Sequence, residues 1–62
     1  MMKQYTVLAL DEFEVPFTMV FDTLSEAEAC FAEWFEANES GETPLYGLDL
    51  LEGSKVLKSA AL

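Results

Sequence analysis

Histidine and arginine are both missing from this 62-residue chain, which has three lysines and one cysteine, Cys30. Without histidine, Ser-His-Asp and Cys-His nucleophilic sites are excluded, and the usual zinc ligand is lost. Without arginine, the chain cannot bind phosphate through a bidentate guanidinium. A lone cysteine forms no intrachain disulfide, whereas small secreted domains usually have several, so we expect a cytoplasmic location.

Glycine and long apolar runs are also scarce. Three isolated glycines cannot build a glycine-rich phosphate loop. The apolar run over residues 4–10 is too short for a signal peptide or a membrane span. The spacing of Asp11, Glu12 and Glu14 does not match a calcium-binding EF-hand loop. Because so short a chain can hardly enclose a pocket as well, we expect no metal, no cofactor and no enzymatic activity.

Acidic residues dominate the charge, with twelve acids against three lysines and a net charge of −9. This balance opposes direct binding to nucleic acid or to an anionic membrane, and it favours a basic protein partner. Yet 52% of the residues are hydrophobic and 13% are aromatic, well above the content of a disordered acidic tail. We therefore expect residues 1–62 to fold as one small acidic domain with a thin core.

The order of apolar and turn-forming segments predicts an α+β fold. Residues 4–10 and 17–22 are predicted strands joined by DEFEVP, and a helix is expected from Ser25 to Asn38 or Glu39. Residues 45–59 read as two further strands that meet around Glu52-Gly53-Ser54, with Val56 anchoring the fourth. The prediction is β-β-α-β-β, with one amphipathic helix packed on a small antiparallel sheet.

The helix is the most strongly patterned segment. At 100° per residue, one arc is apolar and contains Ala27, Cys30, Phe31, Trp34 and Phe35. The opposite arc is acidic and contains Glu26, Glu28, Glu33, Glu36 and Glu39. Thr23 and Ser25 are both capping candidates, since each is followed three residues later by a glutamate. Cys30 is expected to be a small buried hydrophobe and not a reactive thiol.

The two faces of the predicted sheet are both apolar. The face expected against the helix contains Phe17, Met19, Phe21, Tyr46 and Leu48. The second face is expected to contain Leu8, Leu10, Val20, Leu45 and Leu51. One helix can cover only one face. The second face is therefore expected either to be partly exposed or to be covered by another chain, in a homodimer or by a hydrophobic partner.

The later glutamates are not explained by helix stability. Glu33, Glu36, Glu39 and Glu42 recur at every third position, and like-charged neighbours on a helix cost about 0.2–0.5 kcal/mol for each pair. Near the C-terminal end the helix dipole favours cations by about 0.3–1 kcal/mol. Glu26 and Glu28, in contrast, suit the N-terminal end. The predicted partner-binding residues are Glu26, Glu28, Glu33, Phe35, Glu36, Glu39, Glu42 and Phe13.

Two explanations fit the acidic row: a partner with a basic surface, or the excess surface acid of a generally acidic proteome. In size and charge the chain resembles the small acidic inhibitors encoded by phages and mobile elements, some of which mimic nucleic acid and disable host defence enzymes. That resemblance implies an inhibitor that binds a basic protein surface, such as that of a nucleic-acid-binding protein. The alternative is a self-associating accessory or assembly subunit that uses its apolar sheet face, with the acids serving solubility.

Overall fold

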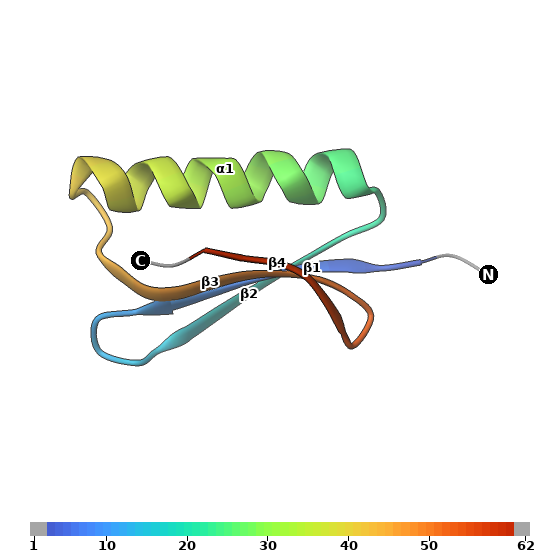
Figure 1. Cartoon of the computed structure of the whole chain (residues 1–62), viewed down its shortest axis with the longest axis horizontal. Coiled ribbons are helices and arrows are strands. Elements are labelled where there is room, and N and C mark those ends of the chain that lie inside the picture. Colours follow the sequence, from blue (N-terminus) through green and yellow to red (C-terminus); the bar gives the residue numbers. More distant parts are fainter. Residues whose placement is uncertain (1–2, 61–62) are drawn as a thin grey trace.

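The computed structural model describes residues 3–60. Along the chain the elements are β1 (Tyr5–Asp11), β2 (Pro16–Phe21), α1 (Leu24–Ser40), β3 (Leu45–Glu52) and β4 (Lys55–Ala60). The four strands form one antiparallel sheet, and α1 lies across one of its faces (Figure 1). The α+β fold with the order β-β-α-β-β, predicted from the sequence, is confirmed.

The strand order in the sheet is β2-β1-β3-β4. The hairpins β1–β2 and β3–β4 are local, whereas the central pairing of β1 with β3 joins the two halves of the chain. This pairing places Val7 opposite Leu50 and Ala9 opposite Leu48. Strands β2 and β4 are the two edges, and α1 connects the first hairpin to the second over one face.

Both ends of α1 have ordinary capping groups. Thr23 is the N-cap, and its Oγ1 accepts a hydrogen bond from the backbone N–H of Glu26 at 3.3 Å and donates one to the Glu26 carboxylate at 2.9 Å. Gly41 ends the helix in the left-handed region, with φ 83°, and its N–H donates to the carbonyl of Asn38. Of the two predicted caps, Thr23 is the one used, and Ser25 lies inside the helix.

The core lies between α1 and the two central strands. It is formed by seven buried residues, Val7, Ala9, Ala27, Phe31, Leu45, Leu48 and Leu50. Cys30, Trp34 and Phe35 are half-buried and pack against this core, so the apolar arc predicted for the helix is confirmed. Trp34 also stacks on Phe17 of edge strand β2, with ring centroids 5.8 Å apart, which closes one flank of the core.

The predicted faces of β3 are wrong at its first two residues. Leu45 was expected on the second sheet face but is only 6% exposed and belongs to the core, whereas Tyr46 was expected against the helix but is 65% exposed. The cause is a bulge: Leu10 pairs with Gly47 and Asp11 with Leu45, which leaves Tyr46 as an extra residue. An extra residue reverses the alternation of side chains, so Leu45 points to the helix side.

A second irregularity corrects the prediction for β4. Leu50 pairs with Lys58 and Leu51 with Val56, so Leu57 is the extra residue here. Val56 therefore shares a face with Leu51, on the side of the sheet away from α1, and it is 54% exposed. Val56, which was expected to anchor the fourth strand, lies outside the core.

The turn after α1 gives a test of stability with a matched control. Gly41→Ala should lower the free energy of unfolding by about 1 kcal/mol, because a Cβ is disfavoured at its positive φ. Gly47→Ala adds the same methyl group where it would meet only Leu10 Cβ at 3.9 Å, an ordinary contact, and should not destabilise the chain. Urea denaturation followed by circular dichroism measures both. Equal losses at the two positions would contradict the assignment of Gly41 as the helix-ending residue.

Candidate protein-binding surfaces

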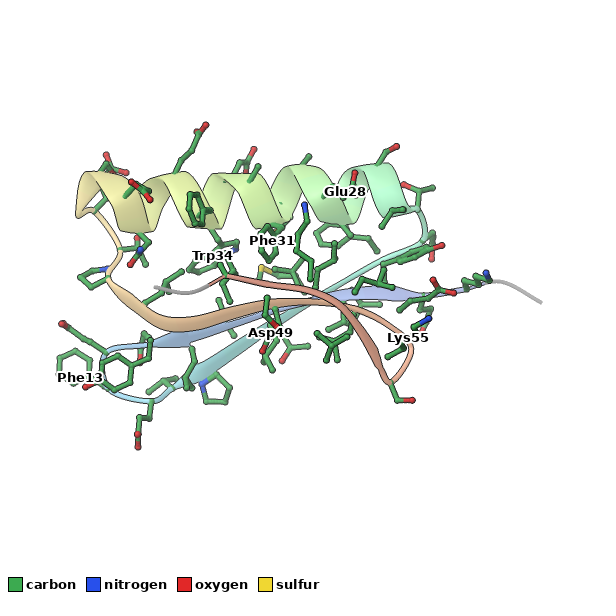
Figure 2. All side chains as sticks on the ribbon, in the orientation of Figure 1. Phe13, Glu28, Phe31, Trp34, Asp49 and Lys55 are labelled. Carbon is green, nitrogen blue, oxygen red and sulfur yellow. The ribbon has the colours of Figure 1, made fainter. Side chains whose placement is uncertain are left out.

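The most highly charged surface runs along the solvent side of α1. We call it the acidic helix surface, and it consists of the exposed residues Glu28, Glu33, Glu36 and Glu39, continued by Glu42 in the turn beyond Gly41. Phe31 and Trp34 extend from the same helix toward the sheet, so the apolar and acidic sides of α1 are separated (Figure 2). The helix thus presents carboxylates to solvent along its whole length.

Within residues 3–60, no cation is paired with the acidic helix surface. An ion pair elsewhere in this range joins Lys3 to Glu52, at 3.1 Å. The hydrogen bond and the charge of Glu52 raise the pKa of Lys3. The Lys58 ammonium lies over the ring of Phe31, 5.2 Å from its centroid, in a cation–π contact. The last turn of α1 has no basic residue. Its negative dipole end therefore adds to the field of Glu36 and Glu39.

Glu26 differs from the other predicted helix acids. Its backbone N–H and its carboxylate both bond to Thr23, so it belongs to the N-terminal cap. Glu28, one turn from this end, has a favourable position relative to the dipole. The acids that helix stability does not explain are therefore Glu33, Glu36 and Glu39 on the helix, with Glu42 after it.

Phe13 lies at the tip of the β1–β2 loop and is 77% exposed. The loop is organised by Asp11, whose Oδ1 accepts hydrogen bonds from the N–H groups of Phe13 at 2.9 Å and Val15 at 2.8 Å. Glu14, with φ 62°, completes the turn by donating its N–H to the Asp11 carbonyl at 3.0 Å. Of the two roles considered for Phe13, a plug in the core or an exposed anchor, the geometry gives the exposed one.

The loop that carries Phe13 lies at the same end of the molecule as the C-terminal end of α1 (Figures 1 and 2). Glu12 and Glu14, on either side of Phe13, are also exposed. This end therefore combines an aromatic ring with acids from two separate segments of the chain. The sequence signal for the loop was Asp11, since aspartate side chains commonly accept bonds from the N–H groups that follow them in a turn.

Phe35 is less accessible than an exposed anchor would be. It is half-buried and, with Phe31, Lys58 and Ala60, lines an open hollow of about 410 Å³ between α1 and the edge strand β4. The sequence placed it at the edge of the apolar arc, and the structure places it at the edge of the core. It can contribute to a partner contact along this flank but does not project from the surface.

Cys30 lies in a sulfur-rich contact at the helix–sheet boundary. Its thiol lies 3.7 Å from the sulfur of Met19, which also accepts a hydrogen bond from Trp34 Nε1 at 3.2 Å. Burial raises the pKa of the Cys30 thiol against a smaller opposing effect of Trp34, and the nearby charge of Glu33, the weakest of the three influences, also raises it. The thiolate is thus disfavoured, which does not suit a nucleophile.

The side of the sheet away from α1 is a second exposed surface, which we call the outer sheet face. It consists of Thr6, Leu8, Leu10, Pro16, Thr18, Val20, Gly47, Asp49, Leu51, Val56 and Ser59. Leu8, Leu10, Val20 and Leu51 were predicted here, but Val56 was not. Asp49 points to this side in Figure 2 and accepts a hydrogen bond from Ser59 Oγ at 2.6 Å.

Two further observations concern metal ligands and membrane spans in the part of the chain that the structure describes. Among residues 3–60, no three or more of the Cys, Asp and Glu side chains are grouped so that they could hold a metal ion. No helix in the same range is both long enough and apolar enough to cross a membrane.

Comparison of the chain with protein-family models, with curated proteins and with solved structures finds no match in any of the three. The surfaces described above are therefore the basis for an inference about function.

The Asp11 loop gives a test of how Phe13 is held. Asp11→Ala should lower the free energy of unfolding by about 1–2 kcal/mol, because two N–H groups lose a charged acceptor, and Asp11→Asn should restore part of it. Amide exchange at Phe13 and Val15 should become faster in the alanine variant. Glu12→Ala, which removes the same charge from an exposed side chain in the same loop, is the control. If it has an equal effect, charge and not hydrogen bonding explains the result.

The environment of Cys30 predicts low thiol reactivity. At pH 7 the folded chain should react with a disulfide reagent several-fold more slowly than the urea-unfolded chain, because the raised pKa reduces the thiolate fraction. As the pH rises through the range of an ordinary thiol pKa, the unfolded chain should accelerate first and the folded chain only at higher pH. An equal or faster rate in the folded chain would show that Cys30 is an activated thiol.

Proposed function

We propose that this protein is a non-enzymatic binding module whose acidic helix surface engages, and in doing so blocks, a basic surface of another protein. The observation that carries the proposal is the row of glutamates on α1, with which no lysine forms an ion pair within residues 3–60. A row of exposed charges of one sign raises the local concentration of an oppositely charged partner and accelerates its association.

The energetic cost of the row supports this interpretation. Like-charged neighbours at Glu33, Glu36 and Glu39, together with an unfavourable dipole end, oppose the helix by roughly 1–2 kcal/mol in total. Stability of small domains is marginal, so this is a considerable fraction of what such a fold has. A basic partner would neutralise the row and remove the cost when it binds.

The spacing of the carboxylates supports a partner that normally binds nucleic acid. Every third residue of an α-helix advances about 4.5 Å along the axis. A nucleic-acid strand has one phosphate charge per about 3.4 Å of axis. The density of negative charge along α1 is therefore comparable with that of a phosphate backbone. Lysine or arginine side chains that are arranged to bind phosphates can also bind the glutamates of α1.

Phe13 adds an apolar contact to this electrostatic surface. Aromatic side chains are frequent energetic centres of protein interfaces, and Asp11 holds the backbone of this one in a hydrogen-bonded loop. Because the loop lies at the same end as the C-terminal turn of α1, one partner can reach both Phe13 and that turn (Figure 2). The charges would then guide association, and the ring would slow dissociation.

The acidic helix surface is tested by reversing two of its charges. Glu36→Lys with Glu39→Lys should weaken binding of the partner by about tenfold or more, while the helix becomes no less stable because repulsion is relieved. The partner is captured on the tagged chain from a lysate of the source cells, eluted with a salt gradient, and then titrated in purified form. Elution at moderate salt is expected for a contact held by exposed charges.

Asp22→Lys, compared with Glu39→Lys alone, is the matched control, because it changes the net charge by the same amount at an exposed site outside α1 and at the other end of the helix from the Phe13 loop. If the two single variants weaken binding equally, the effect is one of total charge, as a generally acidic proteome would give. The proposal would be refuted if the helix variant bound its partner with unchanged affinity while remaining folded by circular dichroism.

A further inference from the structure

We infer that the outer sheet face is covered by a second copy of this chain, so that two sheets pack face to face with both α1 helices on the outside. The inference is independent of the proposed function, since it concerns the opposite side of the sheet. It rests on the pattern of apolar side chains on that face and on the distribution of charge over the molecule.

The outer sheet face has a row of four side chains, one from each strand, of which three are apolar. In register, Val20 of β2, Thr6 of β1, Leu51 of β3 and Val56 of β4 lie side by side. Val20 is 55% exposed and Val56 is 54% exposed, although both belong to strands. Leu8 and Leu10 extend the apolar surface along β1. An exposed apolar patch on a protein surface often marks an interaction site, and among residues 3–60 no second layer covers this one.

The charge distribution indicates which layer that is. Of the acids within the strands, Asp49 alone points to this face, and its carboxylate is already hydrogen-bonded to Ser59. The other strand acids, Asp11 and Glu52, pair with residues on the helix side, and the remaining acids lie on α1 or in connections. In a chain of net charge −9, the outer sheet face is thus a nearly neutral surface.

A second copy could not approach easily by the other side, because two acidic helix surfaces would then meet. Face-to-face packing of the sheets avoids this. Packed sheet layers are about 10 Å apart, and a similar spacing on each side puts the two α1 axes roughly 30 Å apart. The Debye length is about 8 Å at physiological salt, so the repulsion between the two helices would be largely screened.

The size of the face is sufficient for a small dimer. Four strands spaced about 4.8 Å apart and about six residues long give roughly 400 Å² of projected area. A specific interface needs about 1,000 Å² in total, or about 500 Å² from each copy. The relief of the side chains makes the accessible area larger than its projection, so the face reaches this range.

Sedimentation equilibrium of the purified chain over a range of concentrations tests the inference. The wild-type chain should form dimers, and Val20→Lys with Val56→Lys should weaken dimerisation by about tenfold or more, because each lysine would be buried in an apolar contact. The substitutions reduce the net negative charge, so a loss of dimer cannot be ascribed to added repulsion. Ala29→Lys with Ala32→Lys gives the same charge change on the exposed side of α1 and should leave the dimer intact.

Salt provides a second readout. Raising the salt concentration should strengthen the dimer, because it screens two highly acidic copies, whereas it should weaken binding of a basic partner to α1. If the Val20 and Val56 variant does not fold, contacts between differently isotope-labelled wild-type copies can be measured by NMR, and they should join methyl groups of Val20, Leu51 and Val56. A wild-type chain that stays monomeric at millimolar concentration, or a dimer unaffected by the two lysines, would overturn the inference.

Discussion

The antiparallel pairing of β1 with β3 is the interaction on which the rest of this structure depends. Each of the other sheet contacts is a hairpin between neighbouring segments, and hairpins alone are marginally stable in water. The β1–β3 ladder places Val7 and Ala9 beside Leu50 and Leu48. These four residues form the surface of the sheet against which α1 packs Ala27 and Phe31. Without that ladder the apolar arc of the helix would have no continuous surface to cover.

Sequence patterns were sufficient for the elements and for the helix, and they failed where the strands depart from strict alternation. The apolar arc and Thr23 cap of α1 follow from local rules with a period of 3.6 residues. The faces of Leu45, Tyr46 and Val56 depend instead on two bulges, whose positions are set by the pairing of distant strands. A single extra residue moves the side chains beyond it to the opposite face of the sheet, and the residue type alone does not identify a bulge.

The candidate surfaces were predictable to different degrees. The exposed glutamates of α1 followed from composition and period, but the role of Glu26 in the cap needed atomic positions. Phe13 was open to two interpretations until the hydrogen bonds of Asp11 defined its loop. The outer sheet face was anticipated in outline, yet Asp49 with its Ser59 partner and Val56 came to light only through the register. What sequence could not supply was, in each case, the relation between residues far apart in the chain.

The same central ladder constrains the order of events when the chain is made. Strand β1 is synthesised early, but its partner β3 ends at Glu52, so the segments of the first hairpin and α1 are made before the middle of the sheet can form. Contacts between distant segments form later than local ones, because the intervening chain must first be brought together. During that interval Val7 and Ala9 remain uncovered. The acidic residues of α1 are synthesised before β3, and their mutual repulsion would oppose association between incomplete chains during that interval.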